Sequence, residues 1–295
     1  MLFQIRHELH YRYGRAVFLE PHTLRLTPRQ DSTQRLVQHS VELLGAPAGG
    51  SASVLEPGGG DATVFWFTAL RQTLEFTSTA VVETLRANPF NWIITDPQAQ
   101  RLPVSYEPAM AEALAPYLGS AEEHPSVQQW AVSLAQEVGH STTDFLTHLA
   151  ARIHHTFHHQ ARMDGDPMTA AETLELRQGA CRDTAMLYVE ACRSLGLAAR
   201  FVSGYSMHHP PEVSEHELHA WAEVWLPGGG WRSFDPSLGL AVADGHVALS
   251  AARDHRLAAA VSGHYRGTGV SSTFSYSVDV QARTDQSSSG RTGIE

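Results

Sequence analysis

The sequence predicts an α+β protein in which an N-terminal antiparallel β-sandwich-like domain precedes a core with one helix packed on a small antiparallel sheet. Two observations predict this order. From residue 2 to about residue 87, apolar and polar residues alternate with period two, which is typical of half-buried strands. After residue 106 the apolar spacing changes to three and four, which is typical of helices, before strand-like segments return at residue 199.

The expected strands of the N-terminal domain are separated by stretches rich in glycine, proline and serine, which favour turns. These strands are predicted at residues 3–11, 35–43, 63–67 and 72–85. The resulting organisation is a β-rich domain at 1–87, a connector at 88–105, a core with C-terminal strands at 106–282, and a tail at 283–295. The tail has almost no apolar residues, so we expect it to be disordered.

In the core we expect four helices, followed by a strand and a hairpin. The last helix starts at Cys181 and ends before Gly196, because its apolar residues recur at spacings of three and four. A Pro-Gly-Gly-Gly turn at 227–230 then separates the two strands of the hairpin. The predicted helices are 108–117, 126–138, 141–156 and 181–195, and the predicted strands are 199–205, 219–225 and 231–235.

Three residues in this core suggest thiol chemistry: Cys181, His219 and Asp235. A free thiol has a pKa of about 8.5 and is mostly protonated at neutral pH, so a nucleophilic cysteine needs a base. An imidazole can take the proton, and a carboxylate can hold that imidazole in one tautomer. His219 begins one hairpin strand and Asp235 ends the other, so the two should be near-opposite in register. The sequence therefore predicts a Cys-His-Asp triad for acyl transfer.

The predicted place of Cys181 in the first turn of a helix supports this interpretation. Unpaired backbone N–H groups and the helix dipole favour a negative charge at that end. They would stabilise a thiolate, and the N–H of Cys181 could also receive the oxyanion of a tetrahedral intermediate. The second donor to that oxyanion is not identified by the sequence.

Several blocks of the chain resemble the bacterial transglutaminase-like superfamily, in the branch of cysteine proteases. The core blocks are Arg177–Asp183, Ala191–Tyr205, His219–Val224 and Gly230–Pro236. The N-terminal blocks, His7–Tyr13 and Pro21–Arg29, resemble the β-rich domain that precedes this core, and Arg253–His255 and Val261–Gly267 resemble its C-terminal part. The resemblance implies a papain-like core with Cys181 as nucleophile, His219 as base and Asp235 as orienting acid.

Four further residues are candidates for lining the rim of the substrate site or supporting it from behind. Arg182 and Asp183 follow the cysteine, and Trp221 lies two residues after the candidate base. His216 belongs to a loop, 206–218, that precedes this base. A solvated loop without contact to substrate is an equally good interpretation of that segment.

Composition limits the partners and the setting. The net charge of −10, with no lysine and no basic cluster, argues against nucleic acid. No apolar run approaches the roughly 20 residues of a membrane helix, and the N-terminus has no apolar signal core, so we expect a cytoplasmic protein without a membrane partner. The two cysteines, Cys181 and Cys192, would lie roughly 16 Å apart on one helix, beyond disulfide reach. We expect Cys192 to be core packing.

A His-rich stretch, 154–159, contains two pairs at a spacing of four, which could place two imidazoles on one helix face for a metal ion. No glutamate lies between them as a base, so we predict no metal site and no cofactor.

The function we expect is hydrolysis of a peptide, isopeptide or carboxamide bond through a thioester, with a peptide or protein as substrate. Transfer of the acyl group to an amine is one alternative. A non-catalytic peptide-binding module and a metal-dependent hydrolase are two others. The oligomeric state stays open.

Overall fold

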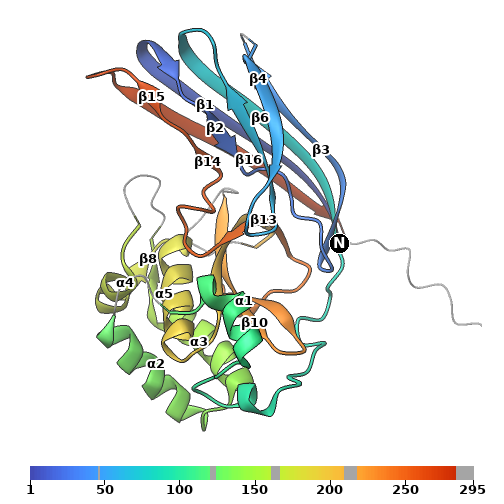
Figure 1. The fold of residues 1–295 in the computed structure, drawn as a ribbon, viewed down its shortest axis with the longest axis vertical. Coiled ribbons are helices and arrows are strands. Elements are labelled where there is room, and N and C mark those ends of the chain that lie inside the picture. The colour runs from blue at the N-terminus through green and yellow to red at the C-terminus, as the bar shows by residue number, and fades with distance from the viewer. Residues whose placement is uncertain (46, 120–123, 161–166, 209–217, 284–295) are drawn as a thin grey trace, which may run out of the picture.

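The computed structural model describes residues 1–45, 47–119, 124–160, 167–208 and 218–283. It confirms the predicted α+β class, with the helices gathered at one end of the molecule and long curved strands at the other (Figure 1). The tail predicted at 283–295 lies outside the described residues, apart from Arg283, which ends the last strand.

The β-rich part consists of two antiparallel sheets. A five-stranded sheet has the order β15-β1-β6-β3, and its fifth strand, β16, also pairs with β1. A four-stranded sheet has the order β14-β2-β5-β4. Alternation along β1 directs Phe3, Ile5 and Leu9 inward, where they join an apolar core with residues of β5 and β6. The strands are β1 (Leu2–Leu19), β2 (His22–Leu24), β3 (Gln34–Leu44), β4 (Gly50–Leu55), β5 (Asp61–Trp66), β6 (Arg71–Thr84), β14 (Val261–Ser262), β15 (Tyr265–Arg266) and β16 (Ser272–Arg283).

The C-terminal strands differ from the predicted organisation, which grouped them with the core at 106–282. β16 pairs with β1 in antiparallel register from Leu2 opposite Arg283 to Tyr13 opposite Ser272, and β14 pairs with β2. The last strands of the chain therefore complete the N-terminal sheets. The physical reason is that β1 is long and central, so its second edge needs a hydrogen-bonding partner that the N-terminal segment does not supply.

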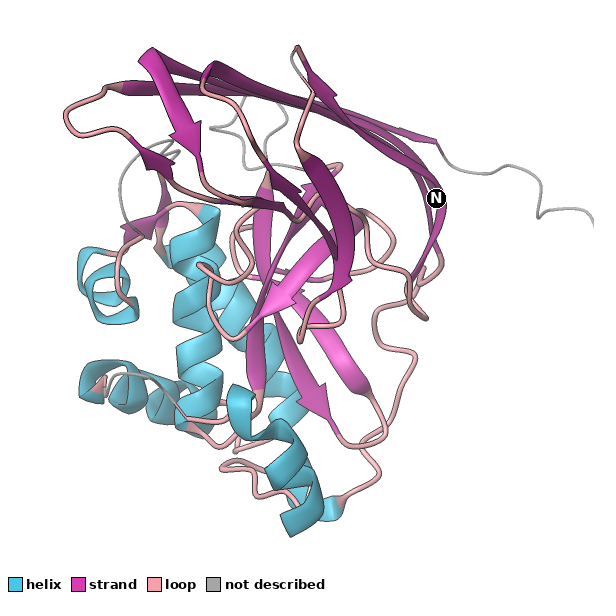
Figure 2. Ribbon diagram, turned by 45° about the horizontal axis from the view of Figure 1, so that its top comes forward, coloured by secondary structure: helices cyan, strands magenta, loops and turns pink. Residues whose placement is uncertain are grey.

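The core consists of helices packed against one side of a five-stranded antiparallel sheet of order β12-β11-β10-β9-β13 (Figure 2). The predicted helices and hairpin are present, with bounds that shift by a few residues. The helices are η1 (Pro97–Gln100), α1 (Pro108–Leu114), η2 (Ala115–Tyr117), α2 (Pro125–Glu137), α3 (Thr142–Thr156), α4 (Ala170–Leu176) and α5 (Cys181–Ser194). The strands of this sheet are β9 (Ala199–Ser206), β10 (His219–Leu226), β11 (Gly230–Asp235), β12 (Leu240–Ala241) and β13 (His246–Ala252), and β7 (His158–His159) pairs with β8 (Gln178–Gly179) in a separate two-stranded parallel sheet.

Helix α4 and strand β13 are the longest of the core elements that were not among the predicted ones. Helix α4 has a local signal that sequence reasoning missed, because Thr169 and Glu172 form a reciprocal capping box at its start. Strand β13 lies on the far edge of the core sheet and pairs with β9. Its short alternation of apolar residues is a weak signal, so tertiary pairing decides its place.

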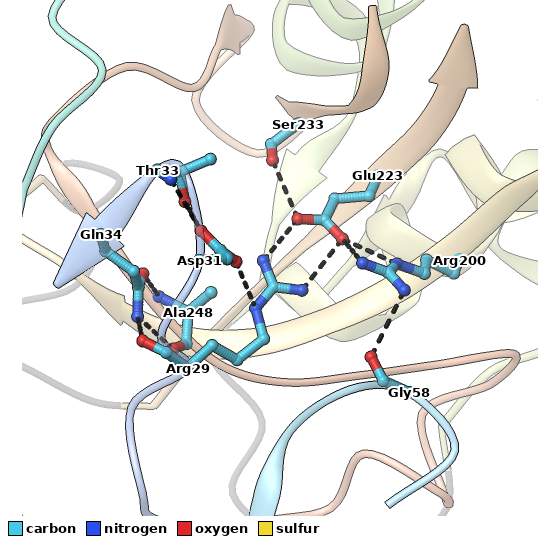
Figure 3. A network of polar contacts seen from close by, with 9 residues as sticks. All are labelled: Arg29, Asp31, Thr33, Gln34, Gly58, Arg200, Glu223, Ser233 and Ala248. Carbon is cyan, nitrogen blue, oxygen red and sulfur yellow. Dashed lines mark hydrogen bonds and ion pairs between the residues drawn. The ribbon is translucent and has the colours of Figure 1, made fainter. Parts of the chain in front are cut away.

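The two parts share one buried interface. Tyr205 of β9 and Val247 and Leu249 of β13 belong to the same apolar cluster as the inward side chains of β1. Beside this cluster, the Glu223 carboxylate of β10 accepts hydrogen bonds from Arg29 at 2.7 and 3.1 Å and from Arg200 at 2.7 Å (Figure 3). Arg29 lies in the loop between β2 and β3, so an ion network joins the N-terminal part to the core sheet.

Candidate active site

The first turn of α5 is held by Asp183, which sets the position of Cys181. The Asp183 carboxylate accepts hydrogen bonds from the backbone N–H of Ala180 at 2.9 Å and of Met168 at 3.0 Å. A Cβ on residue 179 would lie 2.8 Å from the Cβ of Asp183, which is too close. Glycine at position 179 therefore allows the Asp183 carboxylate to approach the backbone. Cys181 is half-buried at this helix end, where backbone N–H groups are free of intrahelical partners.

His219 and Asp235 meet as the sequence predicts. The Nε2 atom of His219 lies 2.6 Å from the Oδ2 atom of Asp235, and both side chains are buried. The hairpin pairs Ala222 with Phe234, so Asp235 lies diagonally from His219 instead of directly across from it. Diagonal neighbours on one face of a sheet remain within reach of each other's side chains.

Asp235 accepts hydrogen bonds on both carboxylate oxygens. Oδ1 accepts from the Ser237 hydroxyl at 2.6 Å and from the backbone N–H groups of Ser237 and Leu238 at 3.0 and 3.2 Å. Oδ2 contacts His219 and also the Nε2 atom of His246 at 3.0 Å. The carboxylate is therefore held in one orientation by its own turn and by β13.

The electrostatics of the pair favour charge separation. Burial by itself would lower the pKa of His219, but the charge and hydrogen bond of Asp235 and a hydrogen bond with Cys181 raise this pKa well above its ordinary value. Burial would raise the pKa of Asp235, and the adjacent His219 and His246 lower it far below its usual range. Because Nε2 of His219 is bonded to Asp235, Nδ1 is the ring nitrogen available to the thiol.

Trp221 and His246 support the imidazole from behind. The Trp221 ring is 1% exposed, with its centroid 6.2 Å from that of His219 and 5.1 Å from that of His246. Gly204 lies across from His219, and a Cβ there would come within 2.1 Å of the Val247 carbonyl oxygen and 2.6 Å of the Trp221 ring. The strands β9, β10 and β13 are therefore packed tightly around Gly204, next to His219.

Sequence reasoning missed His246 and Ser237. Neither has a distinguishing motif, and His246 is one of 18 histidines. Ser237 offers a weak signal, because a serine two residues after an aspartate commonly bonds to it in a turn. His246 reaches Asp235 only through the pairing of β13 with β9, which the sequence did not predict.

The other predicted site residues have mixed outcomes. Arg182 lines the cavity described below, whereas Asp183 is fully buried and supports the helix start from inside. Trp221 is likewise buried behind the site. His216 lies outside the described residues. Cys192 is fully buried in the apolar core, which agrees with its predicted packing role.

The His-rich stretch does not form the helix face on which its metal spacing depends. Helix α3 ends at Thr156, so His154 and His155 lie on the helix while His158 and His159 belong to β7. The Nδ1 atom of His154 is bonded to the Ser237 carbonyl oxygen at 2.8 Å. Among the described residues, the group of three His, Cys, Asp or Glu side chains whose ligand atoms all lie within 4.8 Å of one another is His219, Asp235 and His246, and both imidazoles of this group are already hydrogen-bonded to Asp235.

A cavity of about 350 Å³ opens over Cys181, between the N-terminal sheets and the core. Its core wall includes Arg182, His219 and His255, and its opposite wall comes from β1 and β16. Most of its lining is apolar. The described residues around it are His7, Leu9, Tyr11, His159, Pro167, Ala180, Cys181, Arg182, Phe201, Ser203, Leu218, His219, Ala220, His255, Ala258, Ala259, Ala260, Val261, Phe274 and Tyr276.

Comparison with known proteins covers both parts of the chain. The model of the transglutaminase-like superfamily matches residues 129–236, and that of the bacterial transglutaminase-like N-terminal region matches residues 3–83. An uncharacterized protein of Mycobacterium tuberculosis is 27% identical over 290 residues, covering 94% of this chain and 92% of the relative. An uncharacterized protein of Mycobacterium leprae is 27% identical over 284 residues, covering 90% of this chain and 94% of the relative.

Among solved structures, a protein of Cytophaga hutchinsonii described as a "Putative Cysteine Protease" matches with a TM-score of 0.70 at 21% identity. The match covers 97% of this chain and 92% of that one, so the two share a fold along nearly their whole length. No helix among the described residues is long and apolar enough to cross a membrane.

Proposed function

This chain is a transglutaminase-like superfamily protein with a bacterial transglutaminase-like N-terminal region, and from that premise we propose that it is a thiol-dependent enzyme acting through Cys181, His219 and Asp235. The observation that carries the proposal is the buried 2.6 Å contact between His219 and Asp235, which leaves the other ring nitrogen for the thiol at the start of α5. A cavity large enough for part of a peptide opens directly over Cys181.

In the proposed first half-reaction, His219 takes the thiol proton and the Cys181 sulfur attacks a carbonyl carbon. The resulting oxyanion is stabilised by backbone N–H groups at the start of α5. His219 then donates its proton to the departing amine as the C–N bond breaks, which leaves a thioester. Asp235 holds the ring in one tautomer and stabilises its positive charge throughout.

In the second half-reaction, water attacks the carbonyl carbon of the thioester while His219 accepts a proton from the water. The C–S bond then breaks, His219 returns its proton to the Cys181 sulfur, and the product is a carboxylic acid. We propose hydrolysis of a peptide, isopeptide or carboxamide bond as the net reaction, and no cofactor takes part in these steps. An amine in place of water would give acyl transfer by the same route.

The experiment that tests this proposal is iodoacetamide labelling of the native protein across pH, with each cysteine read separately by peptide mass. We expect Cys181 to label rapidly well below pH 8 and to lose this reactivity in His219→Ala. Cys192 is fully buried and serves as the internal control, because it should stay unlabelled until the protein unfolds. Ordinary thiol behaviour of Cys181 in both proteins would sink the proposal.

Incubation with a peptide library then separates the two net reactions. Cleaved peptides detected by mass, absent with Cys181→Ala, support hydrolysis. Amide-linked products that form only when a primary amine is added would show that the net reaction is acyl transfer to an amine instead of hydrolysis.

A further inference from the structure

The cavity wall formed by the N-terminal sheet includes the imidazole of His7, which has a polar atom without a hydrogen-bond partner among the described residues. His7 lies on β1 and is 2% exposed, yet it lines the same cavity as Cys181. Its Nδ1 atom lies 3.0 Å from the Tyr205 hydroxyl. Its Nε2 atom is buried and has no hydrogen-bond partner among the described residues. A buried polar atom without a partner is costly, so its presence on a residue that lines the same cavity as Cys181 calls for an explanation.

The wall around His7 is aromatic. The centroid of His7 lies 6.0 Å from that of Tyr276, which in turn lies 5.8 Å from Phe274. Tyr11 packs on Phe274 with centroids 4.5 Å apart. The facing core segment is formed of small residues, Ala258–Ala260. An aromatic shelf across from small side chains leaves a slot suited to a flat or apolar side chain.

The charge of the cavity fits a neutral ligand better than a cationic one. None of the described residues that line it is acidic. Burial lowers the pKa of His7 to about 4, so its ring is neutral at pH 7. Burial likewise lowers the pKa of His255 on the opposite wall. A substrate amine would find no carboxylate among these lining residues, whereas a peptide carbonyl could be met by a neutral imidazole.

We propose that His7 is a substrate-binding residue, with Nε2 donating a hydrogen bond to a carbonyl oxygen beside the scissile bond while the aromatic shelf holds an aromatic or apolar residue of a peptide. This inference rests on the proposed function of Cys181. It makes the N-terminal region part of the substrate site, so that the nucleophile comes from the core and the binding groups come from the sheet formed by β1 and β16.

Tyr205 determines which nitrogen carries the ring proton. Burial raises the pKa of Tyr205 well above its ordinary value, so the hydroxyl keeps its hydrogen, and in the proposed arrangement it donates this hydrogen to Nδ1 of His7, 3.0 Å away. The single proton of the neutral ring then lies on Nε2. This makes Nε2 a donor, which is the role that a carbonyl oxygen requires.

The test uses two thiol alkylators and therefore needs no known substrate. Benzyloxycarbonyl-phenylalanyl chloromethyl ketone presents an aromatic side chain and a carbamate carbonyl in addition to the carbonyl next to its reactive carbon, whereas iodoacetamide presents only a carbonyl next to its reactive carbon. For the ketone, the inactivation rate as a function of concentration yields a binding constant KI and a maximal rate of alkylation. We expect His7→Phe to raise KI about threefold to tenfold, the range of a lost hydrogen bond. The maximal rate and the iodoacetamide rate should be unchanged.

Two further variants serve as controls. His10→Phe changes a histidine on the opposite face of the same strand, 41% exposed, and should leave KI unchanged. The double variant of His7→Phe with Tyr205→Phe removes the hydroxyl that the single variant leaves buried without a partner. It should keep the raised KI while recovering stability.

The outcomes distinguish this inference from the function on which it depends. A KI unchanged in His7→Phe and in the double variant overturns the role of His7 alone. A parallel fall in the iodoacetamide rate also overturns it, because His7 would then be supporting the site's structure. If Cys181 reacts slowly with both reagents in the unaltered protein, the proposed thiol chemistry itself fails, and the inference fails with it.

Discussion

At the scale of single residues, Asp235 connects three strands of the core sheet behind the candidate site. It closes β11, accepts hydrogen bonds from the following turn through Ser237, and contacts imidazoles from β10 and β13. Its full burial means that its charge is compensated by these partners alone. The position of His219 therefore depends on this carboxylate.

Replacing this carboxylate should uncouple the thiol. We expect Asp235→Asn to slow the labelling of Cys181 by iodoacetamide, because the base that takes the thiol proton is no longer held and stabilised. Turnover of any substrate found should drop by about 10³- to 10⁴-fold, because an amide cannot stabilise the imidazolium. Asp279→Asn, at an exposed position of β16, is the matched control. An unchanged labelling profile in Asp235→Asn would contradict the role of the carboxylate.

At the scale of elements, the start of α5 shows how a helix end is adapted to hold a thiol. The cap is not a side chain at Ala180 but the Asp183 carboxylate reaching back to the backbone. The same carboxylate binds the N–H of Met168, so it also ties the segment before α4 to the helix that carries Cys181. The glycine before this turn is required for that approach.

Loss of this cap should affect both stability and thiol reactivity. Asp183→Ala should cost about 2 kcal/mol in the free energy of unfolding, at the upper end for a helix cap, and should slow Cys181 labelling. Urea unfolding and the iodoacetamide rate measure the two effects. Glu172→Ala removes the equivalent carboxylate from the capping box of α4 and should reduce stability without changing the labelling rate. Equal labelling effects in the two variants would argue against a specific role for Asp183.

At the scale of the whole molecule, the N-terminal sheets and the core depend on each other. The apolar cluster runs from β1 into β9 and β13, and the Arg29–Glu223–Arg200 network lies beside it with all three residues at most 8% exposed. Arg29 and Arg200 both bind Glu223, and Ser233 adds a weaker hydrogen bond at 3.3 Å (Figure 3). A cavity whose walls come from both parts needs such a fixed junction.

Removing the charge of Glu223 should therefore destabilise the whole molecule. Glu223→Gln leaves the buried Arg200 without its anion and leaves Arg29 with only the 3.5 Å contact to Asp31, which should cost about 3–5 kcal/mol in the free energy of unfolding. The exposed pair of Arg35 and Glu83 provides the control, because Arg35→Met should change stability by about 1 kcal/mol or less. A single calorimetric transition is expected for the unaltered protein. Two separate transitions would show that the junction does not couple the parts.

The same carboxylate predicts a pH dependence. Burial would raise the pKa of Glu223, but Arg29 and Arg200 lower it far below its unfolded value of about 4.3. The unfolded chain therefore takes up a proton first, so this contribution is present above about pH 4.3 and is lost as the pH falls below it. Below about pH 4.3, each further pH unit should lower the free energy of unfolding by about 1.4 kcal/mol. Glu223→Gln removes this contribution to the slope. Urea midpoints from pH 7 to pH 3 test this, and identical slopes in the two proteins would refute it.

The sequence by itself determined the α+β class, the order of the main strands and helices, and the three residues that meet at the candidate site. Periodicity, turn glycines and helix starts are local properties, so they can be recognised without knowing which segments touch. The pairing of His219 with Asp235 was also predictable, because the two strands form one short hairpin.

Tertiary structure alone decided what surrounds that site. The contacts of His246 with Asp235, of β16 with β1 and of His7 with the cavity over Cys181 join segments that local patterns do not connect. Several pairings would satisfy the same alternating strands, and the choice among them depends on which edges and apolar faces the folded chain leaves to be covered. For this reason the cavity, which combines β1 and β16 with the core, could be described only once the fold was known.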